Sequence, residues 1–140
     1  MKMDRRLAIV FAILGAGCTT TSGRHLDPAN VVVASSPWPT PQTLFPNARP
    51  RIINVWMNQT ALHPGDRWIG RIVTSTNVAS VELRTESFSF TADHRGPGNF
   101  EFSQHILDII PQYRRGYVLH IIARNTRGES DQYLIPITIR

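Results

Sequence analysis

The side chains best suited to chemistry in this sequence are five histidines, ten carboxylates and one cysteine. The histidines form neither an HExxH motif nor a His-x-His pair, so their spacing predicts no zinc site. Two neighbouring pairs have the residue types of an acid–base couple: His105 with Asp108, and Asp93 with His94. Such neighbours arise by chance in loops, and we interpret them as polar surface residues.

Nucleophiles and paired carboxylates give no stronger signal. No serine lies in a G-x-S-x-G motif. Glu82, Glu86 and Glu101 fall on separate predicted strands, whereas a glycosidase needs two carboxyl groups that converge on a cleft. The sequence therefore predicts no enzyme, no cofactor and no bound metal ion.

Basic residues give the chain a formal charge of +5, carried by fourteen arginines and one lysine against ten acids. The arginines are spread over the sequence beside acidic neighbours, so we predict no nucleic-acid partner. Arg114 and Arg115, with Arg127 if their loops coincide, are possible contacts for anionic lipid headgroups or acidic glycans. A solvated loop is the favoured interpretation of these three residues.

The first seventeen residues have the plan of a secretory signal. A net-positive head that includes Arg5 and Arg6 precedes an apolar run from Leu7 to Gly17. As a helix this run is about 16 Å long, against a hydrocarbon core of roughly 30 Å, so it is too short for a stable transmembrane helix. Removal of residues 1–17 leaves twelve basic and nine acidic residues, a net charge of +3.

The only cysteine, Cys18, directly follows Ala16 and Gly17 at the end of the apolar run. This arrangement resembles the lipobox of bacterial lipoproteins, which implies that Cys18 is lipidated and becomes the mature N-terminus. Conventional cleavage near Gly17 and a retained N-terminal anchor are the alternatives. The resemblance implies an exported protein, anchored to a membrane of the bacterial cell envelope on its periplasmic or surface side.

Residues 18–50 are interpreted as the lipidated cysteine and a tether rich in Pro, Ser and Thr, because six of the ten prolines fall there. Val31–Val33 is the part that could pair as an added edge strand. Trp38 stands between two prolines, as in peptides that dock into aromatic-lined grooves. The alternative is that Trp38 folds back on the following domain, and we favour it.

From residue 51 to 140, short β-branched and aromatic runs alternate with turn-forming residues. Apolar and polar residues alternate clearly along these runs, for example at Phe100 and Phe102 against Glu101 and Ser103. The pattern predicts an all-β fold, an antiparallel immunoglobulin-like β-sandwich of about seven strands. The expected strands are Ile52–Met57, Trp68–Ser75, Ala79–Thr85, Ser87–Thr91, Asn99–Gln104, Tyr117–Asn125 and Gln132–Ile139.

The segment Tyr117–Ser130 carries a second resemblance. It matches the pattern Tyr-x-hydrophobic-x-hydrophobic-x-Ala-x-Asn-x-x-Gly-x-Ser and is similar to the penultimate strand and turn of fibronectin type III-like and related immunoglobulin-like domains. Asn125 and Gly128 suit the backbone of the tight hairpin. Pro136 in the last strand predicts an edge, or an amide that faces solvent at that point.

These features predict a non-catalytic cell-envelope lipoprotein, an interaction or structural module. Its expected partners are the membrane, through the lipid anchor, and an unknown protein or glycan of the envelope. A secreted or surface carbohydrate-binding or adhesion module is the alternative. Exposed, coplanar Trp56 and Trp68 would favour that alternative, and their burial would count against it.

Overall fold

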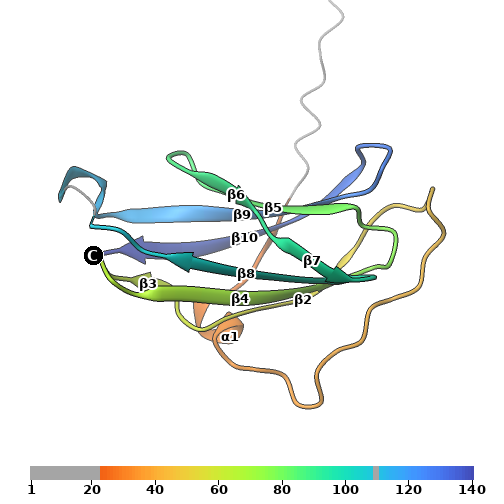
Figure 1. Cartoon of the computed structure of the whole chain (residues 1–140), viewed down its shortest axis with the longest axis horizontal. Coiled ribbons are helices and arrows are strands. Elements are labelled where there is room, and N and C mark those ends of the chain that lie inside the picture. Colours follow the sequence, from red (N-terminus) through yellow and green to blue (C-terminus); the bar gives the residue numbers. More distant parts are fainter. Residues whose placement is uncertain (1–22, 109–110) are drawn as a thin grey trace, which may run out of the picture.

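The computed structural model describes residues 23–108 and 111–140 (Figure 1). The predicted signal, residues 1–17, and Cys18 lie outside these residues. The regular secondary structure of the described chain is almost all β-strand, with one α-helical turn and one 3-10 turn. The elements are β1 (Arg24–His25), α1 (Pro28–Val31), β2 (Ile52–Met57), β3 (Ala61–Leu62), β4 (Arg67–Thr74), β5 (Ser80–Arg84), β6 (Ser89–Thr91), β7 (Asp93–Gly96), β8 (Asn99–His105), η1 (Pro111–Tyr113), β9 (Gly116–Arg124) and β10 (Ser130–Ile139).

The strands form two facing sheets (Figure 1). One sheet has the order β1-β10-β9-β5-β6, with β3 also paired to β10, and the other has the order β2-β4-β8-β7. All pairings are antiparallel except those of β1 and β3 with β10. The predicted all-β sandwich is therefore confirmed, and each of the seven expected strands overlaps a strand of the structure.

Alternating side chains of the two sheets fill the space between them. Along β9, the inward residues from Tyr117 to Ala123 are at most 5 % exposed. Trp68 on β4 is 1 % exposed, and its ring lies 5.1 Å from that of Phe102 and 5.9 Å from that of Phe90. Its indole N–H donates to the carbonyl of Gln59 at 3.1 Å, so the one polar atom of the ring is satisfied. Burial of each large side chain of this kind contributes about 1.5–3 kcal/mol to folding.

The edge of the larger sheet explains the proline in its last strand. β1 pairs with β10 at Tyr133 and Leu134, and β3 pairs with it at Thr138 and Ile139. Pro136 lies between these two short pairings, where β10 has no neighbour on that side. The missing amide of proline therefore costs no ladder hydrogen bond, as the sequence predicts.

From residue 23 to residue 31, the segment interpreted as a tether lies against the sandwich, whereas residues 32–37 are exposed. The backbone N–H of Leu26 donates to the carbonyl of Leu134 at 2.9 Å. Asp27 caps α1 by accepting from the backbone N–H of Ala29 at 2.8 Å, and Val31 in that turn is 2 % exposed. Val31 is thus buried by a helical turn, and the edge strand expected at residues 31–33 does not form.

Strand β7 is the clearest departure from the sequence-based expectation. Residues 94–98 are predicted as a turn, but Asp93–Gly96 pairs with β8 at the edge of the smaller sheet, with a register shift between His94 and Gly96. Its residues are polar because an edge strand with both faces near solvent needs no apolar alternation. Within the described residues, no helix is long and apolar enough to span a membrane.

Candidate functional site

Trp38 lies on the outer side of the smaller sheet. Its ring meets that of Trp56 edge-on, with centroids 6.5 Å apart, and the guanidinium of Arg71 lies 4.7 Å from its centroid. Trp38 is half-buried, and its indole N–H and the Nε–H of Arg71 are both buried without a hydrogen-bond partner among the described residues. This is the fold-back arrangement rather than a free docking peptide.

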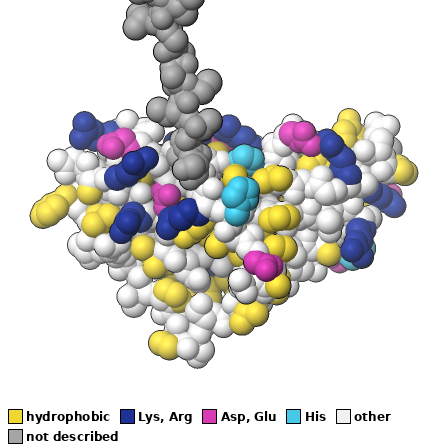
Figure 2. All heavy atoms as spheres, turned by 180° about the vertical axis from the view of Figure 1, so that it is seen from behind, with side chains coloured by type: hydrophobic (Ala, Val, Ile, Leu, Met, Phe, Trp, Pro, Cys, Tyr) yellow, Lys and Arg dark blue, Asp and Glu magenta, His cyan; other side chains and the backbone are white. Residues whose placement is uncertain are grey.

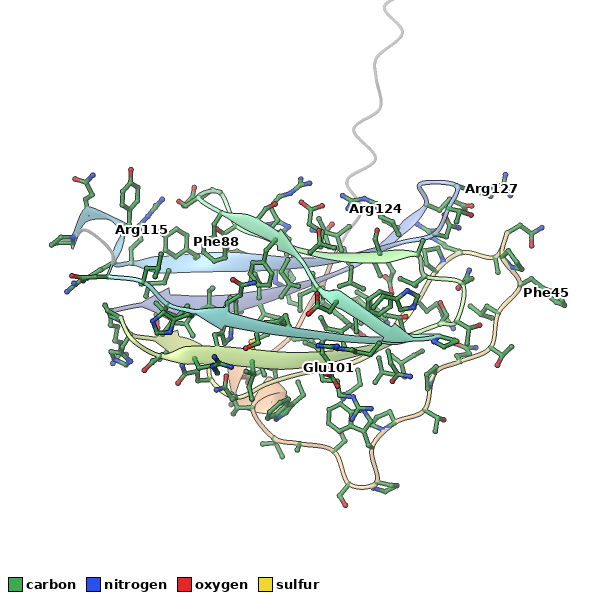
Figure 3. The ribbon with its side chains drawn as sticks, viewed as in Figure 1. Phe45, Phe88, Glu101, Arg115, Arg124 and Arg127 are labelled. Carbon is green, nitrogen blue, oxygen red and sulfur yellow. The ribbon has the colours of Figure 1, made fainter. Side chains whose placement is uncertain are left out.

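The grouping of Arg114 and Arg115 with Arg127, which depended on their loops coinciding, does not form. Arg114 and Arg115 precede β9, whereas Arg127 follows it, so the whole length of the strand separates them; Figure 3 shows Arg115 and Arg127 at opposite ends of the sandwich. Arg115 pairs with Glu86 at 2.6 Å, and its guanidinium lies 4.8 Å from the ring centroid of Tyr117. The loops therefore do not coincide, and the three arginines are no single contact site.

Three other arginines meet at the far end of the sandwich from Arg115. Arg24 on β1 and Arg49 and Arg51 before β2 line a hollow of about 310 Å³, which also includes Pro50 and Asp131. We call this hollow the arginine basin. Figure 2 shows Lys and Arg side chains gathered over the end of the molecule that lies at the left of that view.

Asp131 organises the basin from the start of β10. One of its oxygens accepts from Arg24 Nη2 at 2.5 Å and from the backbone N–H of Ile52 at 2.7 Å. Arg24 also lies over the ring of Tyr133, 4.4 Å from its centroid. Burial raises the pKa of Tyr133, against the opposing effect of Arg24, so the phenol is neutral at pH 7.

All three arginines of the basin are exposed, and Arg49 and Arg51 differ from Arg24 in their partners. Within residues 23–108 and 111–140, neither side chain forms an ion pair, because the only acid that lines the basin, Asp131, is taken by Arg24. The basin therefore carries three positive charges and one negative charge. An anion that enters it meets two guanidinium groups that have no competing carboxylate.

Asn125 connects the basin to two neighbouring turns. Its side-chain oxygen accepts from the backbone N–H groups of Arg127 and Glu129, at 3.1 and 3.0 Å, and its amide nitrogen donates to the carbonyl of Ala48 at 3.2 Å. The backbone N–H of Ala48 donates in turn to the carbonyl of Phe45 at 2.9 Å. Asn125 is 4 % exposed, so one buried side chain fixes both turns.

The turn before Ala48, which Asn125 also holds, carries an exposed aromatic ring. Phe45 is 80 % exposed, and Figure 3 shows it at the same end of the sandwich as Arg127. We call the basin arginines, Arg127 and Phe45 together the arginine end. Its acids are Asp131 and Glu129, the latter 3.8 Å from Arg127, so four arginines face two carboxylates.

The acid–base candidates from the sequence do not converge. His94 stacks on Phe100 at 4.5 Å between centroids, while Asp93 lies 3.6 Å from Arg95. In the part of the chain that the structure describes, no three His, Cys, Asp or Glu side chains lie close enough to share a metal ion.

Glu82, Glu86 and Glu101, the glutamates considered as candidates for a pair of glycosidase carboxylates, each form an ion pair with arginine. The carboxylate of Glu82 accepts from Arg84 and Arg124, at 2.9 and 2.7 Å. Those hydrogen bonds, first from Arg84 and then from Arg124, lower the pKa of Glu82. Glu86 pairs with Arg115, and Glu101 lies 3.5 Å from Arg95.

The tryptophans give no flat platform for a sugar. Trp68 is buried, and Trp56 meets Trp38 at an interplanar angle of 84°. Stacking against a sugar ring needs exposed and coplanar faces, so this geometry counts against the carbohydrate-binding alternative.

Comparisons with known proteins do not identify a family for this chain. No family model matches the chain, and no curated protein sequence matches it. Among solved structures, the Pseudomonas fluorescens alkylpurine DNA glycosylase AlkC, bound to DNA containing an abasic site analog, is similar to 67 % of this chain with a TM-score of 0.45 and 18 % identity. The match spans 31 % of the glycosylase chain.

This match corrects three expectations from the sequence. The matched protein is an enzyme bound to DNA, which contradicts the predictions of a non-catalytic envelope module, of no enzymatic activity and of no nucleic-acid partner. The three predictions, which excluded catalysis and a nucleic-acid partner, are therefore wrong. A likeness at this TM-score and identity transfers neither glycosylase activity nor DNA binding to the present chain.

Proposed function

We propose that this protein binds a phosphate-bearing ligand at the arginine end. The observation that carries the proposal is the pair Arg49 and Arg51, which lie beside a hollow of about 310 Å³ without an acidic partner among the described residues. Arginine is suited to this role because its planar guanidinium donates two parallel hydrogen bonds to phosphate oxygens. The hollow is large enough for one phosphate group with part of what it is attached to.

The surrounding structure supports binding rather than a merely solvated surface. Asp131 holds the guanidinium of Arg24 in place, and buried Asn125 holds the backbone of the turn that bears Arg127, so this part of the arginine end is ordered before a ligand arrives. A site in which one arginine is already held loses less side-chain entropy on binding than a site in which every arginine is mobile. Because the charges are exposed, the affinity should fall as salt is added.

The experiment measures pyrophosphate binding by the full chain, followed by ¹H–¹⁵N chemical shifts. The test variant is R49Q/R51Q, and the matched control is R114Q/R115Q, which removes the same charge from the opposite end. We expect binding to weaken at least about fivefold in the first variant and less than about twofold in the control, since each fivefold step is roughly 1 kcal/mol. Equal weakening in both variants would show a general charge effect and refute the site.

We also propose that the protein is exported and attached to a membrane of the bacterial cell envelope through Cys18. The support is the basic head, short apolar run and small residues before the cysteine. Palmitate labelling of the wild type and of Cys18→Ser tests it. Equal label in the two proteins would end the proposal of acylation.

We further infer that the sandwich is of the immunoglobulin-like kind. The sheet orders β2-β4-β8-β7 and β10-β9-β5-β6 correspond to the ABED and GFC arrangement of such domains, with one added edge strand. Tyr117 at the start of β9 donates its hydroxyl to the carbonyl of Tyr113 at 2.7 Å, as the tyrosine corner of these domains does. An experimentally determined structure with a different strand order would overturn this inference.

A further inference from the structure

We infer that the phosphates recognised at the arginine end are those of an anionic membrane surface, and that Phe45 enters the headgroup layer between them. This inference rests on the function proposed above and names the source of its ligand. Three observations carry it: the exposure of Phe45, the arginines of the same end, and the position of the first described residues.

Phe45 points into solvent from a turn whose backbone is hydrogen-bonded to neighbouring loops. The backbone N–H of Leu44 donates to the Thr76 hydroxyl at 3.1 Å, and that of Ala48 donates to the Phe45 carbonyl. Asn77 and Asn125 both donate to the carbonyl of Ala48, so the turn is fixed to two neighbouring loops. A phenylalanine that is 80 % exposed on a fixed turn gains nothing from the fold, and the water–membrane interface is a favourable environment for such a ring.

The charges around Phe45 are those that anionic lipid attracts. Arg49 and Arg51 have no acidic partner among the described residues, and Arg127 stands on a turn that shares the Asn125 support. A membrane with anionic lipids presents many phosphates in one plane, so several arginines of one surface can be used together. A single free phosphate engages only the basin.

The attachment point proposed above is close in sequence to this end. Arg24, which lines the basin, is six residues after Cys18. Even a fully extended chain of six residues spans at most about 22 Å, less than the diameter of a small domain. A membrane attachment at Cys18 therefore keeps the arginine end near the bilayer.

The test compares amide hydrogen exchange of residues 44–51 in the full chain bound to phosphatidylcholine vesicles and to vesicles that also contain phosphatidylglycerol. A local readout is required because residues 1–17 can hold the chain on either vesicle. We expect exchange in this segment to slow at least about threefold on the anionic vesicles. The slowing should disappear in R49Q/R51Q and in Phe45→Ser.

Matched controls at the opposite end separate this site from a general effect. R114Q/R115Q removes two arginines there, and Leu107→Ser removes a side chain that is 70 % exposed. Both controls should keep the slowing seen in the wild type. Equal exchange on the two kinds of vesicle, or loss of the slowing in the controls, would overturn the inference.

Two further arms identify the source of the phosphate. A single-stranded oligonucleotide that slows exchange in residues 44–51, with no effect of the anionic vesicles, would overturn the membrane inference and leave the phosphate-binding function standing. If inorganic pyrophosphate binds and the vesicles have no effect, the membrane inference would be overturned, and the phosphate-binding function would stand with a soluble ligand. Absence of pyrophosphate binding would instead remove the proposed function itself.

Discussion

Replacement of Asn125 by alanine should weaken the fold and the arginine end together. The side chain of Asn125 makes four hydrogen bonds, to the carbonyl of Ala48, the carboxylate of Glu129 and the backbone N–H groups of Arg127 and Glu129. It is 4 % exposed, so alanine leaves the backbone groups without a partner and lets water reach only some of them.

The expected loss follows from these bonds. A net contribution of about 0.5–1.5 kcal/mol for each hydrogen bond, reduced because the bond to Glu129 is long and lies near solvent, gives about 2–4 kcal/mol for Asn125→Ala. This is a large share of the roughly 5–15 kcal/mol by which a domain of this size is stable. Asn77→Ala is the matched control, since Asn77 donates one hydrogen bond, at 2.6 Å, to the same carbonyl of Ala48. We expect it to cost about 1 kcal/mol.

Urea denaturation of both variants, followed by the fluorescence of buried Trp68, measures these free energies of unfolding. The ¹H–¹⁵N shifts of the folded Asn125→Ala variant should also change at residues 45–48 and 127–129, because one side chain holds both turns. A loss below about 0.5 kcal/mol, or equal losses in the two variants, would refute the view that Asn125 fixes both turns.

Two further predictions concern ion pairs and glycines. Arg84, and then Arg124, lower the pKa of Glu82 in the folded state, so the stabilisation from this carboxylate is present above its unfolded pKa and is lost as the pH falls through its folded pKa. In urea titrations, the difference in free energy of unfolding between wild type and Glu82→Gln should therefore shrink between about pH 5 and pH 3. A difference that stays constant over this range would contradict the prediction. Gly98→Ala and Gly128→Ala both place a side chain at positive φ, +70° and +81°, which costs about 1–2 kcal/mol. A Cβ at Gly98 would also lie 2.6 Å from a backbone oxygen of β4, whereas a Cβ at Gly128 would meet open space. Gly98→Ala should therefore lower the melting temperature clearly more than Gly128→Ala. Equal shifts in the two variants would show that the contact at Gly98 relaxes without cost.

The strands were predictable because their signal is local. Alternation of apolar and polar residues with a period of two is set by the pleat, so β8 was expected within one residue of its observed ends. The run of β-branched and aromatic residues in β2 placed that strand at its observed ends. β1 and β3 are two residues long, too short for a period to appear. β7 is an edge strand of polar residues, which has the composition of a turn.

The arginine end was not predictable in this way. Its arginines are spread from position 24 to position 127, and they meet only because β1 pairs with β10 and the chain before β2 passes the start of β10. The separation of Arg127 from Arg114 and Arg115 was predictable from the sequence. Nine residues of β9 lie between them, and a strand of that length carries its two loops about 30 Å apart.

Both ends of the sandwich carry arginines, and the difference between them lies in the acids that the fold brings close. At one end Arg114 meets Asp108 at 3.2 Å and Arg115 meets Glu86 at 2.6 Å, so cations and anions balance. At the other end Asp131, the only acid among the described residues that line the basin, is paired with Arg24. Since charges in physiological salt act over about 8 Å, a ligand responds to this local surplus and not to the net charge of the chain.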